Sequence, residues 1–185
     1  MGAADVGDRR PLGNAQGGAG LDLARGQADL AIRFFRPQGE GLVAVKASPI
    51  GWGLYASDAY LARRGPVELG QFARHEIIAF DESLKRTAGA VWLSEHAKDA
   101  TVVLRCNSPR ALSDAVAAGM GVSALPCFIA AGNPLLRRLS PSVLASSEVW
   151  LVVHEDLRSV PRVRAVMDFI HGIFQRERAL FAGDQ

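Results

Sequence analysis

Short apolar runs recur along the chain, separated by turns rich in Gly and Pro. Such runs, when bounded by turn residues and enriched in β-branched side chains, predict buried strands. Residues 1–19 carry no apolar periodicity, and their Gly, Ala and polar composition predicts a disordered segment. Pro49 is expected to separate two of the strands. The expected strands span residues 28–32, 42–46, 50–55, 76–80, 101–105, 121–125 and 148–154.

Helical signals alternate with these runs. Ser57 suits the N-cap of a helix that Gly65 would end. Ser108 precedes Pro109, which suits a first helical position because its missing N–H costs nothing there. Strands that alternate with helices predict an α/β fold with parallel strands. The expected helices span residues 21–26, 58–64, 68–74, 109–118 and 161–182, while Trp92 and Leu93 are interpreted as a strand or turn within the mixed segment 81–98.

The composition is that of a globular domain with balanced charge. Hydrophobic residues make up 49% of the 185 residues and charged residues 22%, as is typical of such domains. The net charge of +2, from 21 basic and 19 acidic residues, is too small for an electrostatic nucleic-acid surface. No apolar run is long enough for a membrane span, and residues 1–20 lack the apolar core of a secretion signal, so we expect none. The two cysteines suit a reducing cytoplasm.

Signatures of catalysis, metals and cofactors are weak. The four histidines and two cysteines lack metal-ligand spacing. A dinucleotide-like pattern runs from Gly119 to Ala124, but a helix precedes it and a strand follows, which reverses the order that a cofactor needs. Ser123 lacks the second glycine of a nucleophile elbow, whereas Cys106 has a helix start nearby that can lower its pKa. We predict no catalytic residue, metal or cofactor, and keep a small hydrolase built on Ser123 or Cys106 as an alternative.

The segment Asn107-Ser108-Pro109 carries a stronger signal. It follows a predicted strand and opens a helix, so backbone N–H groups and the Ser108 hydroxyl converge there. Such a helix start binds carboxylates, phosphates and other small anions. Plain N-capping by Ser108 is compatible with this interpretation, because caps at the carboxyl ends of strands line the ligand crevice of α/β sheets.

Five segments in order give the chain a family resemblance. Each consists mostly of core and turn residues, but together they cover most of the chain. The chain resembles the effector-binding domain of LysR-type transcriptional regulators, within the type 2 periplasmic-binding-protein superfamily. The resembling segments are residues 22–33, 53–61, 117–126, 148–154 and 156–169.

The resemblance implies a division of the chain and a set of binding residues. It implies two α/β lobes joined by two crossing strands, near residues 52–57 and 145–150. Residues 20–57 and 145–182 would form the first lobe with its hinge strands, and residues 58–144 the second lobe. A small organic anion would bind in the cleft as effector. The effector-binding positions that it implies are Arg33, Phe34, Ser57, Phe80, Asn107, Ser108 and Pro109.

The chain also departs from the family pattern. Family members begin with a winged helix-turn-helix, and their effector domain opens with a strand, a helix and a second strand before the segment that starts at Asp22. We therefore expect an incomplete first lobe, no direct nucleic-acid binding, no membrane contact, and a homo-oligomer whose dimer surface is incomplete. A periplasmic-type solute-binding protein and a nonfunctional fragment are the alternatives.

Overall fold

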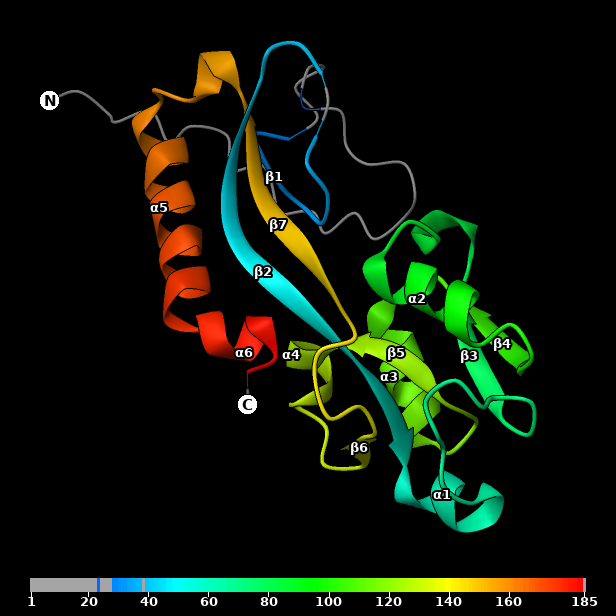
Figure 1. Cartoon of the computed structure of the whole chain (residues 1–185). Helices are drawn as coiled ribbons and strands as arrows, with labels where there is room; N and C mark the ends of the chain where they lie inside the picture. Colours follow the sequence, from blue (N-terminus) through cyan, green and yellow to red (C-terminus); the bar gives the residue numbers. More distant parts are fainter. Residues whose placement is uncertain (1–22, 24–27, 38, 185) are drawn as a thin grey trace, which may run out of the picture.

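The computed structural model describes residues 23, 28–37 and 39–184. The expected disorder at 1–19 and, apart from Leu23, the expected helix at 21–26 lie outside these residues. Helices and strands are mixed along the chain (Figure 1). The strands are β1 (Leu30–Arg33), β2 (Leu42–Ser57), β3 (Glu76–Phe80), β4 (Thr101–Cys106), β5 (Ser123–Pro126), β6 (Leu136–Arg138) and β7 (Ala145–His154). The helices are α1 (Asp58–Arg64), α2 (Ala88–His96), α3 (Pro109–Ala117), α4 (Cys127–Ala130), α5 (Pro161–Arg176) and α6 (Arg178–Ala182), with short 3-10 helices η2 (Glu82–Leu84) and η3 (Glu155–Leu157).

The long strand β2 runs through the whole molecule (Figure 1). Its first part pairs with β7, from Leu42 opposite His154 to Trp52 opposite Ala145. Its last part pairs with β5 and β6. With β1 on the far side of β7, these strands form one sheet in the order β1-β7-β2-β5, and every pairing in it is antiparallel.

Among the described residues, parallel pairing is confined to the neighbourhood of β3. β3 and β4 are parallel, and an isolated parallel bridge joins Ile77 to Val122 just before β5. The α/β expectation is confirmed, but the expected parallel arrangement of all the strands is wrong. The reason is that apolar runs mark buried strands without marking the direction in which they pair.

Helices cover both halves of the molecule. α5 packs along β2 in the half that contains β1 and β7, and its buried side chains are Val163 and Phe174 (Figure 1). We call this part the β7 half. α1, α2 and α3 surround β3, β4 and β5, which we call the β3 half. β2 belongs to both.

Four local expectations are corrected. Residues 42–46 and 50–55 belong to one strand, with a register shift between Lys46 and Ser48 and with Pro49 paired opposite Glu148. Residues 68–74 form no helix. A bridge joins Glu68 to Gln71 around Gly70, whose φ of +88° favours glycine.

The other two corrections concern helix boundaries. Trp92 lies inside α2, which Thr87 begins by accepting a hydrogen bond from Ala90 N at 3.4 Å. The C-terminal helix is divided at Glu177, whose φ of −97° and ψ of 21° end α5 before α6 begins. The mixed polar and apolar pattern of residues 81–98 gave no clear helical signal for α2. The apolar stripe from α5 into α6 is continuous, so nothing in the sequence indicated the break between them.

Candidate functional site

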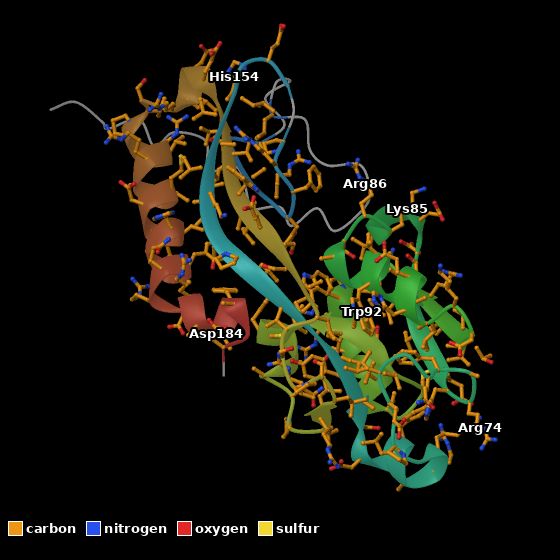
Figure 2. All side chains as sticks on the ribbon, viewed as in Figure 1. Arg74, Lys85, Arg86, Trp92, His154 and Asp184 are labelled. Atoms are coloured by element: carbon orange, nitrogen blue, oxygen red, sulfur yellow. The ribbon has the colours of Figure 1, made fainter. Side chains whose placement is uncertain are left out.

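The carboxyl ends of β3 and β4 lie side by side. Phe80 is opposite Cys106 in the register, and Asp81 N donates to Cys106 O at 3.0 Å. The structure therefore brings Phe80 together with the segment Asn107–Pro109 at one edge of the β3 half. We call this the carboxyl edge. In Figure 2, Lys85 lies toward this end of the β3 half, whereas Arg74, close before β3, lies at the opposite end.

Ser108 stands at the start of α3 without capping it. Its backbone carbonyl accepts from Leu112 N at 3.0 Å, but its side chain makes no capping hydrogen bond. Ser108 has the extended backbone of an N-cap residue, but the expected N-capping by its hydroxyl is wrong, because the side chain bonds no N–H of the first turn. The hydroxyl is available beside the N–H groups of the first turn, an arrangement suited to an anion.

Trp52 connects the carboxyl edge to the long strand. Its ring meets Phe80 edge-on, with ring centroids 5.9 Å apart and planes at 65°. Its indole N–H donates to Ser147 Oγ at 3.0 Å, so it also ties β2 to β7. A Cβ at Gly89 would lie 2.3 Å from Trp52 Cε3, so glycine is needed for this approach of α2. Sequence reasoning missed Trp52, although an aromatic residue on a predicted crossing strand was a usable signal.

Arg33 and Phe34 come from the β7 half. Arg33 ends β1 opposite Trp150. Because β1 and β7 are antiparallel, the chain that leaves β1 at Phe34 heads toward the start of β7, where Ala145 pairs with Trp52. Phe34 is 51% exposed. The two residues are therefore directed toward the part of β7 that adjoins the carboxyl edge.

Ser57 lies elsewhere. It follows Trp52 on β2 by roughly 16 Å of extended strand, toward the end of the sheet where β3 begins. It is 3% exposed, and its hydroxyl accepts from Tyr60 N at 3.2 Å. The predicted N-cap of α1 is confirmed, but the structure does not bring Ser57 together with Phe80 and Ser108.

The two nucleophile candidates are held in unreactive surroundings. Ser123 is fully buried, and its hydroxyl donates to Ile78 O at 2.7 Å. Burial, with a smaller contribution from the charge of Asp81, raises the pKa of Cys106. The expected lowering of that pKa is therefore wrong, because loss of solvation outweighs the nearby helix start. In the described part of the chain, no three His, Cys, Asp or Glu side chains are grouped so as to hold a metal ion.

Cys106 is expected to react slowly with iodoacetamide near neutral pH. The raised pKa lowers the fraction of thiolate, which is the reactive form. Peptide mapping by mass spectrometry would follow the alkylation of Cys106 in the native protein and in denaturant. Faster alkylation of the native protein than of the unfolded chain would contradict the assignment.

Gly119 and Gly121 have structural roles. Gly119 follows α3 with a φ of +77° and donates its N–H to Val116 O at 3.0 Å, which confirms that it ends the helix. A Cβ at Gly121 would lie 2.7 Å from Glu76 O, so the chain passes close to β3 there. Neither glycine opens a helix toward a phosphate.

The family model and the solved structures that match this chain point to one family. The model of the LysR substrate binding domain matches residues 16–175. No curated protein matches the sequence. Among solved structures, the regulatory domain of CrgA, a LysR-type transcriptional regulator from Neisseria meningitidis, is similar, with 21% identity and a TM-score of 0.69 over 82% of this chain and 78% of that one.

Two further structures are similar at low identity. The effector domain of AmpR from Pseudomonas aeruginosa has 16% identity and a TM-score of 0.68, over 88% of this chain and 80% of that one. The CcmR regulatory domain from Synechocystis PCC6803, in complex with 2-PG, has 16% identity and a TM-score of 0.63, over 82% of this chain and 76% of that one. These likenesses confirm the type 2 periplasmic-binding-protein-like fold.

None of the helices in the described part of the chain combines the length and apolar character that crossing a membrane demands. The family match covers well over half of the sequence, and the solved structures share the fold. The resemblance inferred from the five sequence segments is thereby confirmed. The chain belongs to the LysR substrate-binding domain family, as an effector-binding domain of the LysR type.

Proposed function

We propose that this domain binds a small organic anion between the carboxyl edge and the end of β1. Asn107, Ser108 and Pro109 would contact the anion from the β3 half, and Arg33 and Phe34 from the β7 half. Phe80 would form the apolar wall beside them. The single observation that carries the proposal is the Ser108 hydroxyl, which stands at the start of α3 without a capping bond. Ser57 is left out of the proposed site, because its hydroxyl is already bonded to Tyr60 N.

The proposed site lies between two lobes. We assign residues 20–57 and 145–182 to the first lobe with its hinge strands, and residues 58–144 to the second. β2 supports the assignment because it pairs with β7 over its first part and with β5 over its last part. An anion that touches both lobes would bind a closed arrangement more tightly than an open one. That difference in affinity is what can shift the equilibrium toward closure.

We also propose that the domain is cytoplasmic and catalyses no reaction. The free thiols of Cys106 and Cys127 support a reducing compartment. The buried and bonded hydroxyl of Ser123 and the raised pKa of Cys106 argue against a nucleophile at either position. A folded-state label from a serine- or cysteine-reactive activity probe would contradict this assignment.

Two serine substitutions test the proposed site. Thermal shift with oxalate, pyruvate, benzoate and inorganic phosphate would first identify an anion that stabilises the domain. Ser108→Ala is then expected to weaken that anion roughly 10-fold or more, as the loss of a hydrogen bond to a charged group does. Its melting temperature without ligand should hardly change, because the hydroxyl makes no capping bond.

Ser57→Ala is the matched variant with the opposite expectation. It removes a cap and should lower the free energy of unfolding by about 0.5–2 kcal/mol, while leaving the anion affinity unchanged. Ser159→Ala, at an exposed position after η3, should change neither quantity. The proposal would be contradicted if no anion stabilised the domain, or if Ser57→Ala weakened binding and Ser108→Ala did not.

A further inference from the structure

A pocket of about 460 Å³ lies between α2 and the parallel pair β3–β4. Its floor is formed by Ile77 and Ala79 of β3 and by Val102 of β4, and its roof by α2. The lining residues come entirely from the β3 half. The volume falls within the range of roughly 300–1,000 Å³ that is usual for small-molecule sites.

Small side chains on α2 create this pocket. Ala90, Leu93, Ser94 and Ala97 line it at the spacing of one helix face. Leu93 is the one large side chain among these four, so this face cannot fill the space above Ala79. The helix lies over the sheet, but most of its facing side chains are too short to pack against it.

A bulge in β4 adds a cation to the pocket. The register shifts between Ile77 and Ile78, so that Ile77 is opposite Val102 and Ile78 is opposite Leu104. Strict alternation would place Val102 and Arg105 on opposite faces of β4, yet both line the pocket. The extra residue therefore returns Arg105 to the face that α2 covers.

The charges at the rim favour an anion. Lys85 and Glu82 neutralise each other, with Lys85 Nζ 2.7 Å from Glu82 Oε2. Arg105 donates to the carbonyl of Phe80 at 3.3 Å and makes no ion pair with any described residue. Lys98 has neither a hydrogen bond nor an ion pair within the described part of the chain. Two cations are thus left without a carboxylate at the mouth of an apolar space.

We propose that this pocket is a second ligand site, separate from the effector site, for a small carboxylate with a compact apolar body. The body would fill the space under Ala90 and Ala97, and the carboxylate would meet Lys98 and Arg105. Phe80 also lines the pocket and contacts Trp52. A molecule bound here would therefore touch the ring that forms a wall of the carboxyl edge, and binding at the two sites would be coupled reciprocally.

Cyclohexanecarboxylate is the probe that tests the pocket. In two-dimensional ¹H–¹⁵N spectra of the whole chain, titration is expected to produce saturable shifts at the amides of Ala90, Val102 and Arg105. The neutral analogue cyclohexylmethanol should bind more weakly. Lys98→Gln should weaken cyclohexanecarboxylate roughly two- to five-fold, as expected for one exposed cation.

Ala90→Leu is expected to abolish the saturable shifts by filling the pocket, with the fold confirmed by the dispersion of the same spectrum. Ser94→Leu fills the same space from the next turn and should act alike, which guards against a local effect of one variant. Val91→Leu, on the exposed face of α2, is the matched control and should bind as the parent does. Shifts that persist in both filled variants, or their absence from the parent, would overturn the proposal. The amide of Arg110 lies in the first turn of α3, beside the proposed effector site. Its shifts therefore test anion binding at the effector site separately from binding in this pocket.

Discussion

Replacing Trp52 with Ala is expected to lower the free energy of unfolding by about 3–5 kcal/mol, as for other buried Trp and Phe truncations. Trp52 is 3% exposed and fills the place where β2 crosses from the β7 half to the β3 half. Its ring touches Phe80 and lies against Gly89, so the cavity would open between two strands and α2. Urea unfolding followed by far-ultraviolet circular dichroism measures the loss without depending on the fluorescence of the removed indole.

The hydrogen bond of Trp52 can be separated from its packing. Ser147→Ala removes the acceptor of the indole N–H and should cost only about 1 kcal/mol. Trp52→Phe keeps a ring opposite Phe80 and should fall between the two. If Trp52→Ala were no more destabilising than Ser147→Ala, Trp52 would not be the packing centre of the crossing.

Local signals in the sequence predicted several of the helix starts and stops. Ser57 was predicted to cap α1 and does so, and Gly119 was predicted to end α3 and does so with a positive φ. Such features depend on neighbours within a few residues, so the sequence around them contains the information. The start of α3 at Pro109 was predicted for the same reason.

Pairing between distant strands could not be predicted in the same way. The longest ladder joins Leu42 to His154, more than a hundred residues apart. The apolar runs indicate neither the direction nor the register of that pairing. Both depend on the path that the chain takes between β2 and β7. The family resemblance supplied the crossing strands that periodicity could not.

The candidate site was predicted only in part, because some of its contacts join residues that are far apart in the sequence. Phe80 and Ser108 were predicted together because the family resemblance implies both as effector-binding positions. For Ser108 the sequence adds a local signal, since it follows a predicted strand and opens a helix. Ser57 was included because the resemblance placed it at a hinge, whereas the structure places it along β2 from Trp52 and uses its hydroxyl as a cap. The role of Trp52 depends on contacts with Phe80 and Ser147, which lie far away in the sequence.

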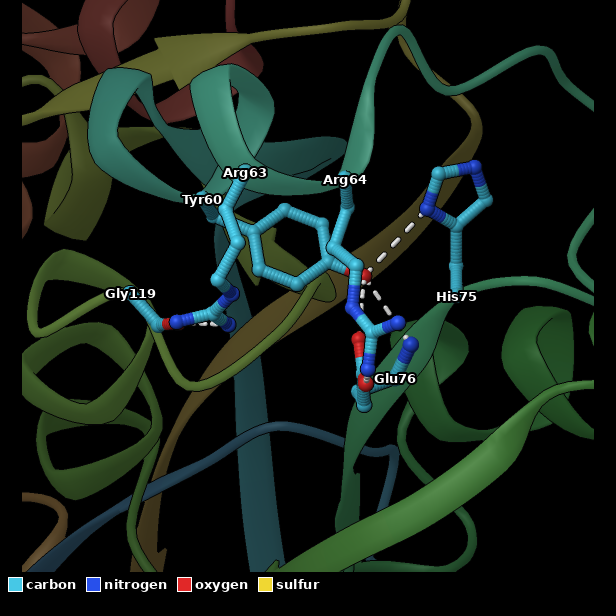
Figure 3. Close-up of polar contacts among 6 residues, drawn as sticks. All are labelled: Tyr60, Arg63, Arg64, His75, Glu76 and Gly119. Atoms are coloured by element: carbon cyan, nitrogen blue, oxygen red, sulfur yellow. Dashed lines mark hydrogen bonds and ion pairs between the residues drawn. The ribbon is translucent and has the colours of Figure 1, made fainter.

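Tyr60 is the centre of the second large expected effect. Its hydroxyl donates to Glu76 Oε2 at 3.0 Å and accepts from Glu76 N at 2.9 Å (Figure 3). A hydroxyl has one proton to donate, so His75 Nδ1, 3.2 Å away, must donate to it. Arg64 completes the group through an ion pair with Glu76. These contacts fasten α1 to the start of β3.

Tyr60→Phe is expected to lower the free energy of unfolding by about 1–3 kcal/mol, because buried polar partners lose their hydrogen bond. Tyr60 is fully buried, His75 is 6% exposed, and the ring would stay in place. Arg64→Gln is the matched control. It breaks an ion pair whose arginine is 45% exposed, and should cost less than about 1 kcal/mol. Equal losses in the two variants, measured by urea unfolding, would contradict the assignment of the network to the hydroxyl.

The same hydroxyl should make the domain sensitive to alkali. Burial raises the pKa of Tyr60 above its usual value near 10, against smaller opposing effects of Arg64 and Arg63. The folded state then keeps the phenolic proton to higher pH than the unfolded state does. The contribution of Tyr60 to stability is therefore fully present below about pH 10 and is lost as pH rises further. Tyr55, the other tyrosine of the chain, also has a pKa raised by burial.

Tyr60→Phe should flatten, but not remove, the loss of stability above pH 10, since Tyr55 still contributes. Urea unfolding at several alkaline pH values, with tyrosinate absorbance followed in parallel, would measure this. An unchanged slope in Tyr60→Phe would contradict a role for Tyr60 in the alkaline transition.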